Sequence, residues 1–207
     1  MLVKCSNMKK REYIPDLEMY KKTLDVLVEN NEIKTLVAVR MGCEMGISRL
    51  EIVNARVSDI DRINKRGLWI EVAKKVRRGS KKDKDGIKHP VFEMRQREIP
   101  VNSSLYQLLK TYTAASQMYI LHRDKGDIKK PFIPRYINTL YEANNVPWSS
   151  HKSRHYFKTR VWSWMMQSKQ VDVGLLKELL GHQKNVTENY GEYSWDYKRD
   201  VVDKVFQ

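Results

Sequence analysis

The residues best suited to chemistry lie in one stretch of the chain, from His151 to Tyr190. His151 and Arg154 are three positions apart, so on a helix they share one face and can converge on a single group. A Leu-Leu-Gly-His sequence ends at His182, and Tyr190 follows eight residues later. Two histidines, an arginine and a tyrosine are the groups needed to hold a phosphodiester, protonate its leaving oxygen and attack its phosphorus.

Each part of this pattern also occurs for reasons unrelated to catalysis. A His-x-x-Arg pair is common on solvated helix faces. Gly181 and His182 suit an ordinary helix C-terminus, and a tyrosine in a tyrosine-rich tail ordinarily packs. The three parts together, in this order, are what favour a reactive site.

In order and spacing, HxxRH, LLGH and a following tyrosine resemble the catalytic domain of the tyrosine recombinases, the phage-type and archaeal integrases. The usual motif there reads H-x-L-R-H, then an L-G-H turn, then the nucleophilic tyrosine. Here Ser153 stands at the usual leucine, and Tyr190 lies one residue closer to His182 than is commonest. Tyr193 is the alternative nucleophile, but the Val-Thr pair before Tyr190 resembles the family's lead into its tyrosine helix and favours Tyr190.

The resemblance implies a role for each residue. Tyr190 attacks the phosphorus, and Arg154 clamps the non-bridging oxygens. His151 acts on the tyrosine proton as general base or acid, and His182 is a second donor to the phosphate. Arginines and histidines supply the charge that a metal would otherwise give, and covalent catalysis conserves the bond energy, so no metal and no other cofactor is expected.

The run GISRLEIVNARVSDID contributes a further arginine. Ser48 and Glu51 have capping-box spacing, which predicts a helix with Arg49 in its first turn, where free N–H groups favour an anion. The run is similar to the family's T-G-L-R-I-S-E-L and S-D-I-D, whose arginine is the first of two that clamp the phosphate. Without a gap Ser48 falls on that position, and a loop shortened by one residue would place Arg49 there, so we assign the role to Arg49. The alternatives are Arg40 and Arg56.

A change of pattern after Gly67 predicts a strand over residues 68–73 and a second over residues 91–101. The charged run KKVRRGSKKDKDGIKH between them predicts a β-hairpin or three-stranded sheet with a basic, mobile tip. By resemblance this turn carries a lysine that protonates the departing 5′ oxygen, and Lys75 is the aligned residue. The alternatives are Lys74, Lys81 and Lys82. Most lysines of this loop then serve as contacts to the phosphate backbone.

Helical periodicity and capping signals predict the elements that position these residues. Pro15 ends an N-terminal arm, and Ser103 or Ser104 caps a helix that carries apolar residues as far as Tyr119. A Trp-Ser-Ser sequence caps the helix of His151, whose VWSWMM half is expected to be a buried apolar stripe. The remaining helices are expected from Asp16, from Glu32 to about Met45, from Pro134 to before Asn144, and over the leucines at 175, 176, 179 and 180.

Composition bounds the class of protein. The 207 residues carry 39 Lys and Arg against 25 Asp and Glu, a formal net charge of +14 with a pI near 9.7, which attracts polyanions. No segment approaches the ~20 apolar residues of a membrane span, and the first residues lack a signal-peptide core. Cys5 and Cys43 are too few and too far apart for a disulfide framework or a zinc site. We therefore expect an intracellular, cytoplasmic, DNA-associated protein.

The sequence therefore predicts an α+β, mostly α fold, a helical recombinase catalytic domain with a small antiparallel β-sheet on one edge. Residues 1–15 are an arm or linker remnant and residues 16–207 the catalytic domain. The expected activity is site-specific recombination or integration, as for a virus or mobile element, through a 3′-phosphotyrosyl intermediate. The alternatives are a type IB topoisomerase-like enzyme and a non-catalytic DNA-binding protein on the same scaffold. Expected partners are duplex DNA and further copies of the chain, as a tetramer on DNA, with no membrane and no small-molecule substrate.

Overall fold

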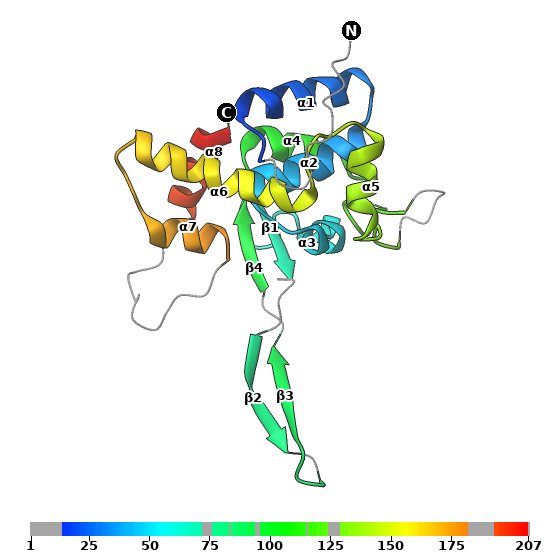
Figure 1. Cartoon of the computed structure of the whole chain (residues 1–207), viewed down its shortest axis with the longest axis vertical. Helices are drawn as coiled ribbons and strands as arrows, with labels where there is room; N and C mark the ends of the chain where they lie inside the picture. Colours follow the sequence, from blue (N-terminus) through cyan, green and yellow to red (C-terminus); the bar gives the residue numbers. More distant parts are fainter. Residues whose placement is uncertain are drawn as a thin grey trace.

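The computed structural model describes residues 14–71, 76–82, 84–93, 96–114, 116–123, 129–181 and 193–206. Within these ranges, eight α-helices form a body from which a strand ribbon projects (Figure 1). The helices are α1 Leu17–Glu29, α2 Ile33–Met45, α3 Arg49–Asn54, α4 Ser103–Tyr112, α5 Tyr136–Ala143, α6 Ser150–Gln167, α7 Val173–Leu179 and α8 Trp195–Phe206, with a short 3-10 helix η1 Val57–Asp59. The strands are β1 Gly67–Glu71, β2 Val76–Lys82, β3 Lys88–Glu93 and β4 Gln96–Pro100. The predicted fold class is confirmed.

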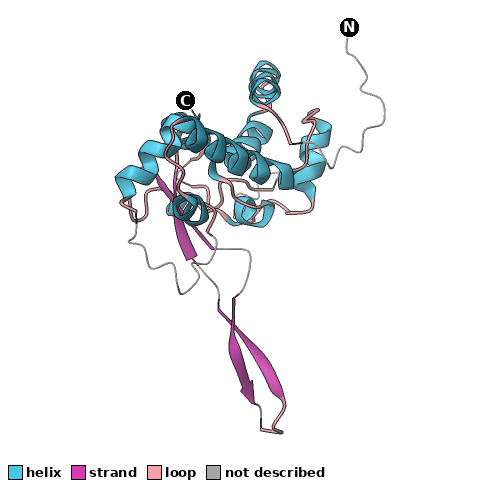
Figure 2. Cartoon of the chain, turned by 60° about the vertical axis from the view of Figure 1, so that its left-hand side comes forward, coloured by secondary structure: helices cyan, strands magenta, loops and turns pink. Residues whose placement is uncertain are grey.

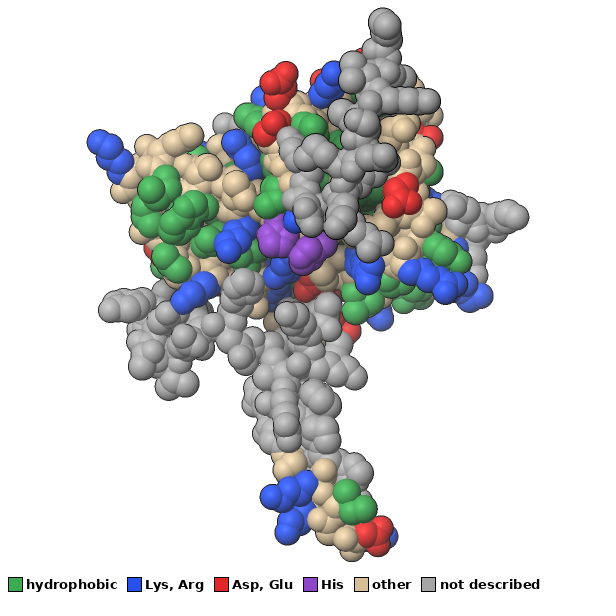
Figure 3. Space-filling view, in the orientation of Figure 1, with side chains coloured by type: hydrophobic (Ala, Val, Ile, Leu, Met, Phe, Trp, Pro, Cys, Tyr) green, Lys and Arg blue, Asp and Glu red, His purple; other side chains and the backbone are tan. Residues whose placement is uncertain are grey.

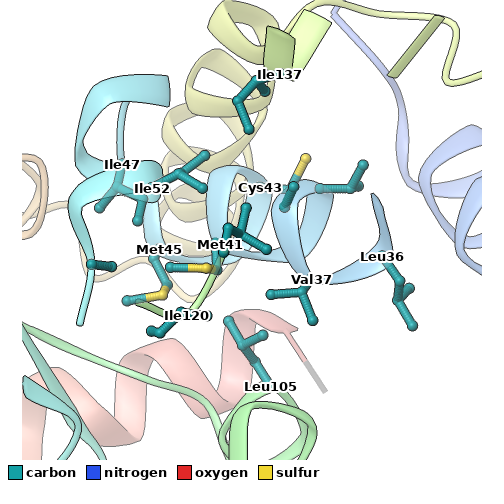
Figure 4. Close-up of a cluster of buried hydrophobic side chains, with 14 of the residues drawn as sticks. Leu36, Val37, Met41, Cys43, Met45, Ile47, Ile52, Leu105, Ile120 and Ile137 are labelled. Atoms are coloured by element: carbon teal, nitrogen blue, oxygen red, sulfur yellow. The ribbon is translucent and has the colours of Figure 1, made fainter. Parts of the chain in front are cut away.

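Helix α2 lies at the centre of the larger hydrophobic core. It packs against α1, α3, α4, α5 and α6. Its side chains Val37, Val39, Met41, Cys43 and Met45 are all fully buried, as expected for a helix at the centre of a core. Figure 4 shows four of them, all but Val39, in one cluster with labelled side chains from neighbouring helices, such as Ile52 of α3 and Leu105 of α4. Because α2 is fixed on every side, α3 and α6 are held firmly on it.

A second hydrophobic cluster joins α6, α7 and α8. Val161 and Met165 of α6 are fully buried in it, and the Phe157 and Phe206 rings stack at 5.6 Å. Its other members include Leu175, Leu176, Leu179, Leu180, Val201, Val202 and Val205. The predicted buried VWSWMM stripe is confirmed only for the face of α6 that carries Val161 and Met165. Trp162 and Met166 lie on the outward face of the helix and are 38% and 55% exposed.

The strands form two antiparallel pairs, where a hairpin or three-stranded sheet was predicted. β1 pairs with β4, with Gly67 opposite Pro100 and Glu71 opposite Gln96. β2 pairs with β3 in the ribbon that leaves the helical body (Figure 2). The predicted strand over residues 91–101 therefore covers parts of both β3 and β4, and the charged run holds β2 and the start of β3. No apolar alternation in the sequence announces this ribbon.

Several helix boundaries follow from local capping. Asp16 caps α1 by accepting a hydrogen bond from the Met19 N–H at 2.8 Å, as predicted. Gly46 ends α2 in the left-handed region with φ 62°, where a side chain would be strained. At the start of α6, Ser149 is the N-cap without a side-chain hydrogen bond, and Asn138 of α5 instead accepts from the Ser150 N–H at 3.0 Å.

The predicted start of α4 near Ser103 is confirmed, but the predicted cap and the predicted end were wrong. Asn102 is the N-cap, because its side chain accepts from the Leu105 N–H at 2.9 Å, so Ser103 lies inside the helix. The helix ends at Tyr112, where Thr113 is extended. Tyr119, which continues the apolar period, lies instead in an extended segment that bridges to Arg56. Tertiary pairing has overridden a local helical pattern.

Candidate active site

Arg154 lies between α3 and the C-terminal end of α7. Its Nη1 donates to Oε2 of Glu51 at 3.4 Å, and its Nη2 donates to the Leu180 carbonyl oxygen at 2.8 Å. These two contacts hold the Arg154 side chain in place. It is 25% exposed, so it is still open to solvent. Because Leu180 comes just before the Gly-His pair of the predicted motif, this contact joins the two halves of that motif, which are far apart in sequence.

Glu51 fixes the start of α3 beside Arg154. Its Oε2 accepts from the Ser48 N–H at 2.6 Å, and Ser48 Oγ accepts from the Glu51 N–H at 3.4 Å. The predicted capping box is confirmed. The Glu51 side chain is only 1% exposed, and a buried carboxylate requires partners. One carboxylate thus closes a helix cap and orients Arg154.

The three arginines considered for the second clamp position have other surroundings. Arg49 is the first residue of α3 and is exposed, and no hydrogen bond or ion pair joins it to another residue within the described ranges. Arg40 donates through Nε to the buried Glu44 at 2.7 Å. The Arg56 guanidinium lies over the Tyr119 ring, 5.9 Å from its centroid. In the part of the chain that the structure describes, none of these arginines is paired with Glu51 or Arg154.

His151 and His155 form a pair on the outer face of α6. Their Nε2 atoms are 3.0 Å apart and their rings meet edge to face at 4.6 Å. One proton between the two nitrogens makes this hydrogen bond, so it is lost when both rings are imidazolium. Partial burial lowers the pKa of His155, as do the neighbouring charges of His151, Lys152, Lys158 and Arg154. The shift therefore favours the neutral form of His155.

Ser153, which stands where the family motif has leucine, is buried at the crossing of α2 and α6. A Cβ added to Gly42 of α2 would lie 2.8 Å from the Ser153 Cβ, which is closer than real contacts allow. Ser153 Oγ accepts from Trp148 Nε1 at 3.1 Å and lies 3.4 Å from the Tyr141 hydroxyl. Two small residues thus let α6 approach α2 closely, and Trp148 fills the adjacent space.

Arg97 of β4 is a site residue that the sequence reading missed. Its Nη1 donates to the Leu179 carbonyl oxygen at 2.6 Å, while its Nε and Nη2 atoms are buried and have no hydrogen-bond partner within the described ranges. A Cβ on Gly181, whose φ is +67°, would lie 2.6 Å from Arg97 Nε. Burial lowers the pKa of Arg97 to about 10. The negative charge of Glu51 raises this pKa, and the positive charge of Arg154 lowers it further. The only available signal was the likeness of REIPV to the end of a family strand.

Tyr193 is held at the opposite end of α7. Its hydroxyl donates to Asp172 Oδ1 at 2.6 Å, the same oxygen that caps α7 by accepting from the Leu175 N–H. Burial and the bond to Asp172 raise the Tyr193 pKa to about 12. The Tyr193 ring also stacks on Tyr197 at 6.1 Å. The Tyr193 side chain is thus engaged within the fold by Asp172 and Tyr197, as expected for a residue that begins the packing of α8.

The sequence profile of the phage integrase family matches residues 17–194, which covers most of the chain. The chain belongs to this family. No curated protein matches it. The matched range includes every residue of the site described above, and it includes both Tyr190 and Tyr193, the two tyrosines considered as nucleophile.

Solved structures of phage-type integrases and related recombinases share the fold. The integrase from mycobacterium phage Brujita is 14% identical, with a TM-score of 0.61 over 98% of this chain and 63% of that one. XerA recombinase is 13% identical, with a TM-score of 0.57 over 96% of this chain and 61% of that one. The Tn1549 transposon integrase, solved with circular intermediate DNA, is 15% identical, with a TM-score of 0.57 over 94% and 65%. The chain thus spans less than two thirds of each of these structures.

Several expected integrase residues lie outside the described ranges. These are Lys74, Lys75, His182 and Tyr190. Of the alternative lysines, Lys81 pairs with His89 and Lys82 with Lys88 toward the far end of the β2–β3 ribbon, away from the helical body (Figure 1). Lys75 directly precedes Val76, where the ribbon leaves that body. The choice of Lys75, with Lys74 as its neighbouring alternative, stays a prediction.

Positive charge surrounds the histidine pair. Figure 3 shows histidine side chains near the middle of one face, with lysine and arginine side chains on both sides of them.

No described group of three or more His, Cys, Asp or Glu side chains could hold a metal ion. None of the helices within the described ranges is long and apolar enough to cross a bilayer.

Proposed function

We propose that this chain is a site-specific DNA recombinase that cleaves and rejoins DNA through a 3′-phosphotyrosyl intermediate. The observation that carries the proposal is the pair of contacts made by Arg154. They bring the start of α3, the HxxR face of α6 and the end of α7 together at one partly exposed guanidinium. A planar fork of N–H donors is suited to the non-bridging oxygens of a phosphodiester.

In the proposed reaction, Tyr190 Oη attacks phosphorus and the bond from phosphorus to the 5′ oxygen breaks. The tyrosine proton passes to His151, and the 5′ oxygen takes a proton from Lys75. His182 and Arg154 stabilise the charge that develops on the phosphoryl oxygens. In the second step the 5′-hydroxyl of another strand attacks the phosphotyrosine and gives its proton to Lys75, while His151 returns its proton to the departing Tyr190 oxygen, so the bond energy is conserved.

Duplex DNA is the proposed substrate, and the chain is proposed to act inside a cell. The net charge of +14 supports this, since it favours the phosphate backbone irrespective of sequence. Structures similar in fold support it too, because lambda integrase has been solved as a dimer bound to a core site and as a tetramer bound to a Holliday junction. We extend the tetramer, and a role in the integration of a virus or mobile element, to this chain as part of the proposal.

Covalent capture tests the proposal. The chain is mixed with a pool of nicked duplexes of random sequence, and protein linked to DNA is recovered under denaturing conditions. We expect a linked species enriched in one sequence, and transfer of a labelled strand between two duplexes of that sequence. Relaxation of supercoiled plasmid without transfer would indicate a topoisomerase instead. DNA binding with no linked species at all would indicate a non-catalytic protein.

A further inference from the structure

Arg97 and Arg154 are anchored on consecutive peptide groups. Arg97 donates to the carbonyl of Leu179, and Arg154 donates to the carbonyl of Leu180. The two guanidinium groups come from β4 and α6, and both meet the last turn of α7, whose carbonyls form the negative end of a helix dipole. This turn leads directly to Gly181, so both arginines lie beside the start of the segment expected to carry His182.

The charges at this place do not balance. Glu51 is the carboxylate that interacts with both arginines, and it also closes the cap of α3. Among the described side chains, these two guanidinium groups face one carboxylate, which leaves a positive charge. Arg97 Nε and Nη2 are buried and lack an acceptor within the described ranges. Burying a charge without full compensation is costly, so such a group in a native structure needs an explanation.

We propose that Arg97 supplies the second positive charge of the phosphate site, the role that sequence resemblance alone assigns to Arg49. This inference rests on the proposed recombinase function. Arg49 is exposed and unpaired within the described ranges, whereas Arg97 and Arg154 are held on the adjacent carbonyls of Leu179 and Leu180. A buried charge acts through a medium of low dielectric, so it stabilises a nearby phosphorane without touching it. Arg97 is therefore a positioning residue: it holds the end of α7 and raises the potential around Arg154.

The test removes the positive charge of Arg97 from the protein and, separately, one negative charge from the scissile phosphate of the DNA. Arg97→Met keeps the apolar stem and removes the charge, and Arg97→Lys keeps the charge. Each variant is given the captured duplex with either the normal scissile phosphate or a methylphosphonate, in which a methyl group replaces one charged oxygen. A neutral methylphosphonate needs less positive charge in its transition state, so it compensates for a missing cation.

With the normal phosphate, we expect covalent complex formation by Arg97→Met to fall ~100-fold relative to the unaltered chain. With the methylphosphonate, covalent complex formation by Arg97→Met and by the unaltered chain should differ by less than ~10-fold. On the normal phosphate, Arg97→Lys should lose less covalent complex formation than Arg97→Met. An equal loss on both substrates would assign Arg97 a purely structural role. No loss on either would overturn the inference directly.

Arg160 offers a matched control. It also donates to a carbonyl near a helix end, Val205 of α8 at 3.2 Å, and it also has a buried Nε without a partner within the described ranges. Arg160→Met should show no change in the ratio of cleavage of the two substrates.

Two outcomes separate the possible failures. If Arg97→Met does not fold, Arg97→Gln is measured in the same way, and failure of both uncharged variants to fold would show that the guanidinium serves the fold, against the inference. If the unaltered chain links to neither substrate, the recombinase proposal itself fails.

Discussion

Gly42 and Ser153 mark a close approach of α2 and α6, since a Cβ on Gly42 would lie 2.8 Å from that of Ser153. The same α6 turn carries Arg154, so the packing of this crossing sets how deeply the arginine reaches toward α3. A leucine, usual at this position in the family, has no room here.

The first prediction is that Ser153→Leu destabilises the fold. Overpacking a core costs roughly 1–3 kcal/mol, and Trp148 Nε1 also loses its acceptor. Ser153→Ala is the control, because it removes the hydroxyl without adding volume and should cost about 1 kcal/mol. The free energy of unfolding is measured by urea denaturation. Equal stability of Ser153→Leu and the unaltered chain would show that the crossing is looser than the structure indicates.

The second prediction concerns the guanidinium of Arg154. Arg154→Lys keeps the charge but loses the planar fork, so covalent complex formation should fall ~100-fold while DNA affinity changes little. The same change at Arg160, on the same helix, should leave cleavage within a few-fold of normal. Cleavage by Arg154→Lys at the normal rate would argue that the contacts to Glu51 and Leu180 serve the fold alone.

The third prediction is a pH dependence of stability from His155. Its lowered pKa means that the unfolded chain binds a proton more readily than the folded one. The free energy of unfolding should therefore fall as the pH drops below the ordinary histidine value of 6.5. His155→Gln should flatten this fall, and Lys158→Gln, which removes a neighbouring charge, should weaken it. Thermal melts between pH 5 and pH 8 measure the slope, and an unchanged slope in His155→Gln would contradict the assignment.

The helices were largely predictable from sequence, because each carries its own signals. The Asp16 cap, the capping box of Ser48 and Glu51, and the left-handed Gly46 are local features, and local physics decides them. The end of α4 was not predictable in this way. Its apolar period continues to Tyr119, and only the bridge to Arg56, far along the chain, shows that the segment is extended.

The candidate site was predictable in part. The spacing of His151 and Arg154 indicated a shared helix, and the structure places both on α6. Arg97 was not predictable, because nothing in a charged sequence indicates which arginine is buried, and its acceptor lies 82 residues away. The same holds for the pairing of Tyr193 with Asp172, which only the folded chain brings together.

The fourth prediction concerns the salt dependence of DNA binding. Lysines on the β2–β3 ribbon, such as the exposed Lys82 and Lys88, are expected to contact phosphates, so log affinity should fall linearly with log salt, with a slope of about −0.9 per contact. Lys82→Ala with Lys88→Ala should make the slope less steep by about 2. Lys204→Ala, at a lysine paired with Asp200 on α8, is the control and should not change it. A flat salt response of the unaltered chain would contradict a backbone-dominated interface.

The most direct measurement of the central claim is the identity of the tyrosine that becomes linked to DNA. Protein captured on the nicked duplex is digested, and the peptide that carries the nucleotide is sequenced. We predict that the link is at Tyr190. Tyr190→Phe should fold and bind DNA but form no linked species, whereas Tyr193→Phe, which loses only its bond to Asp172, should still form one. Linked species from Tyr190→Phe but not from Tyr193→Phe would contradict the choice of tyrosine, and linked species from both would contradict the proposed chemistry.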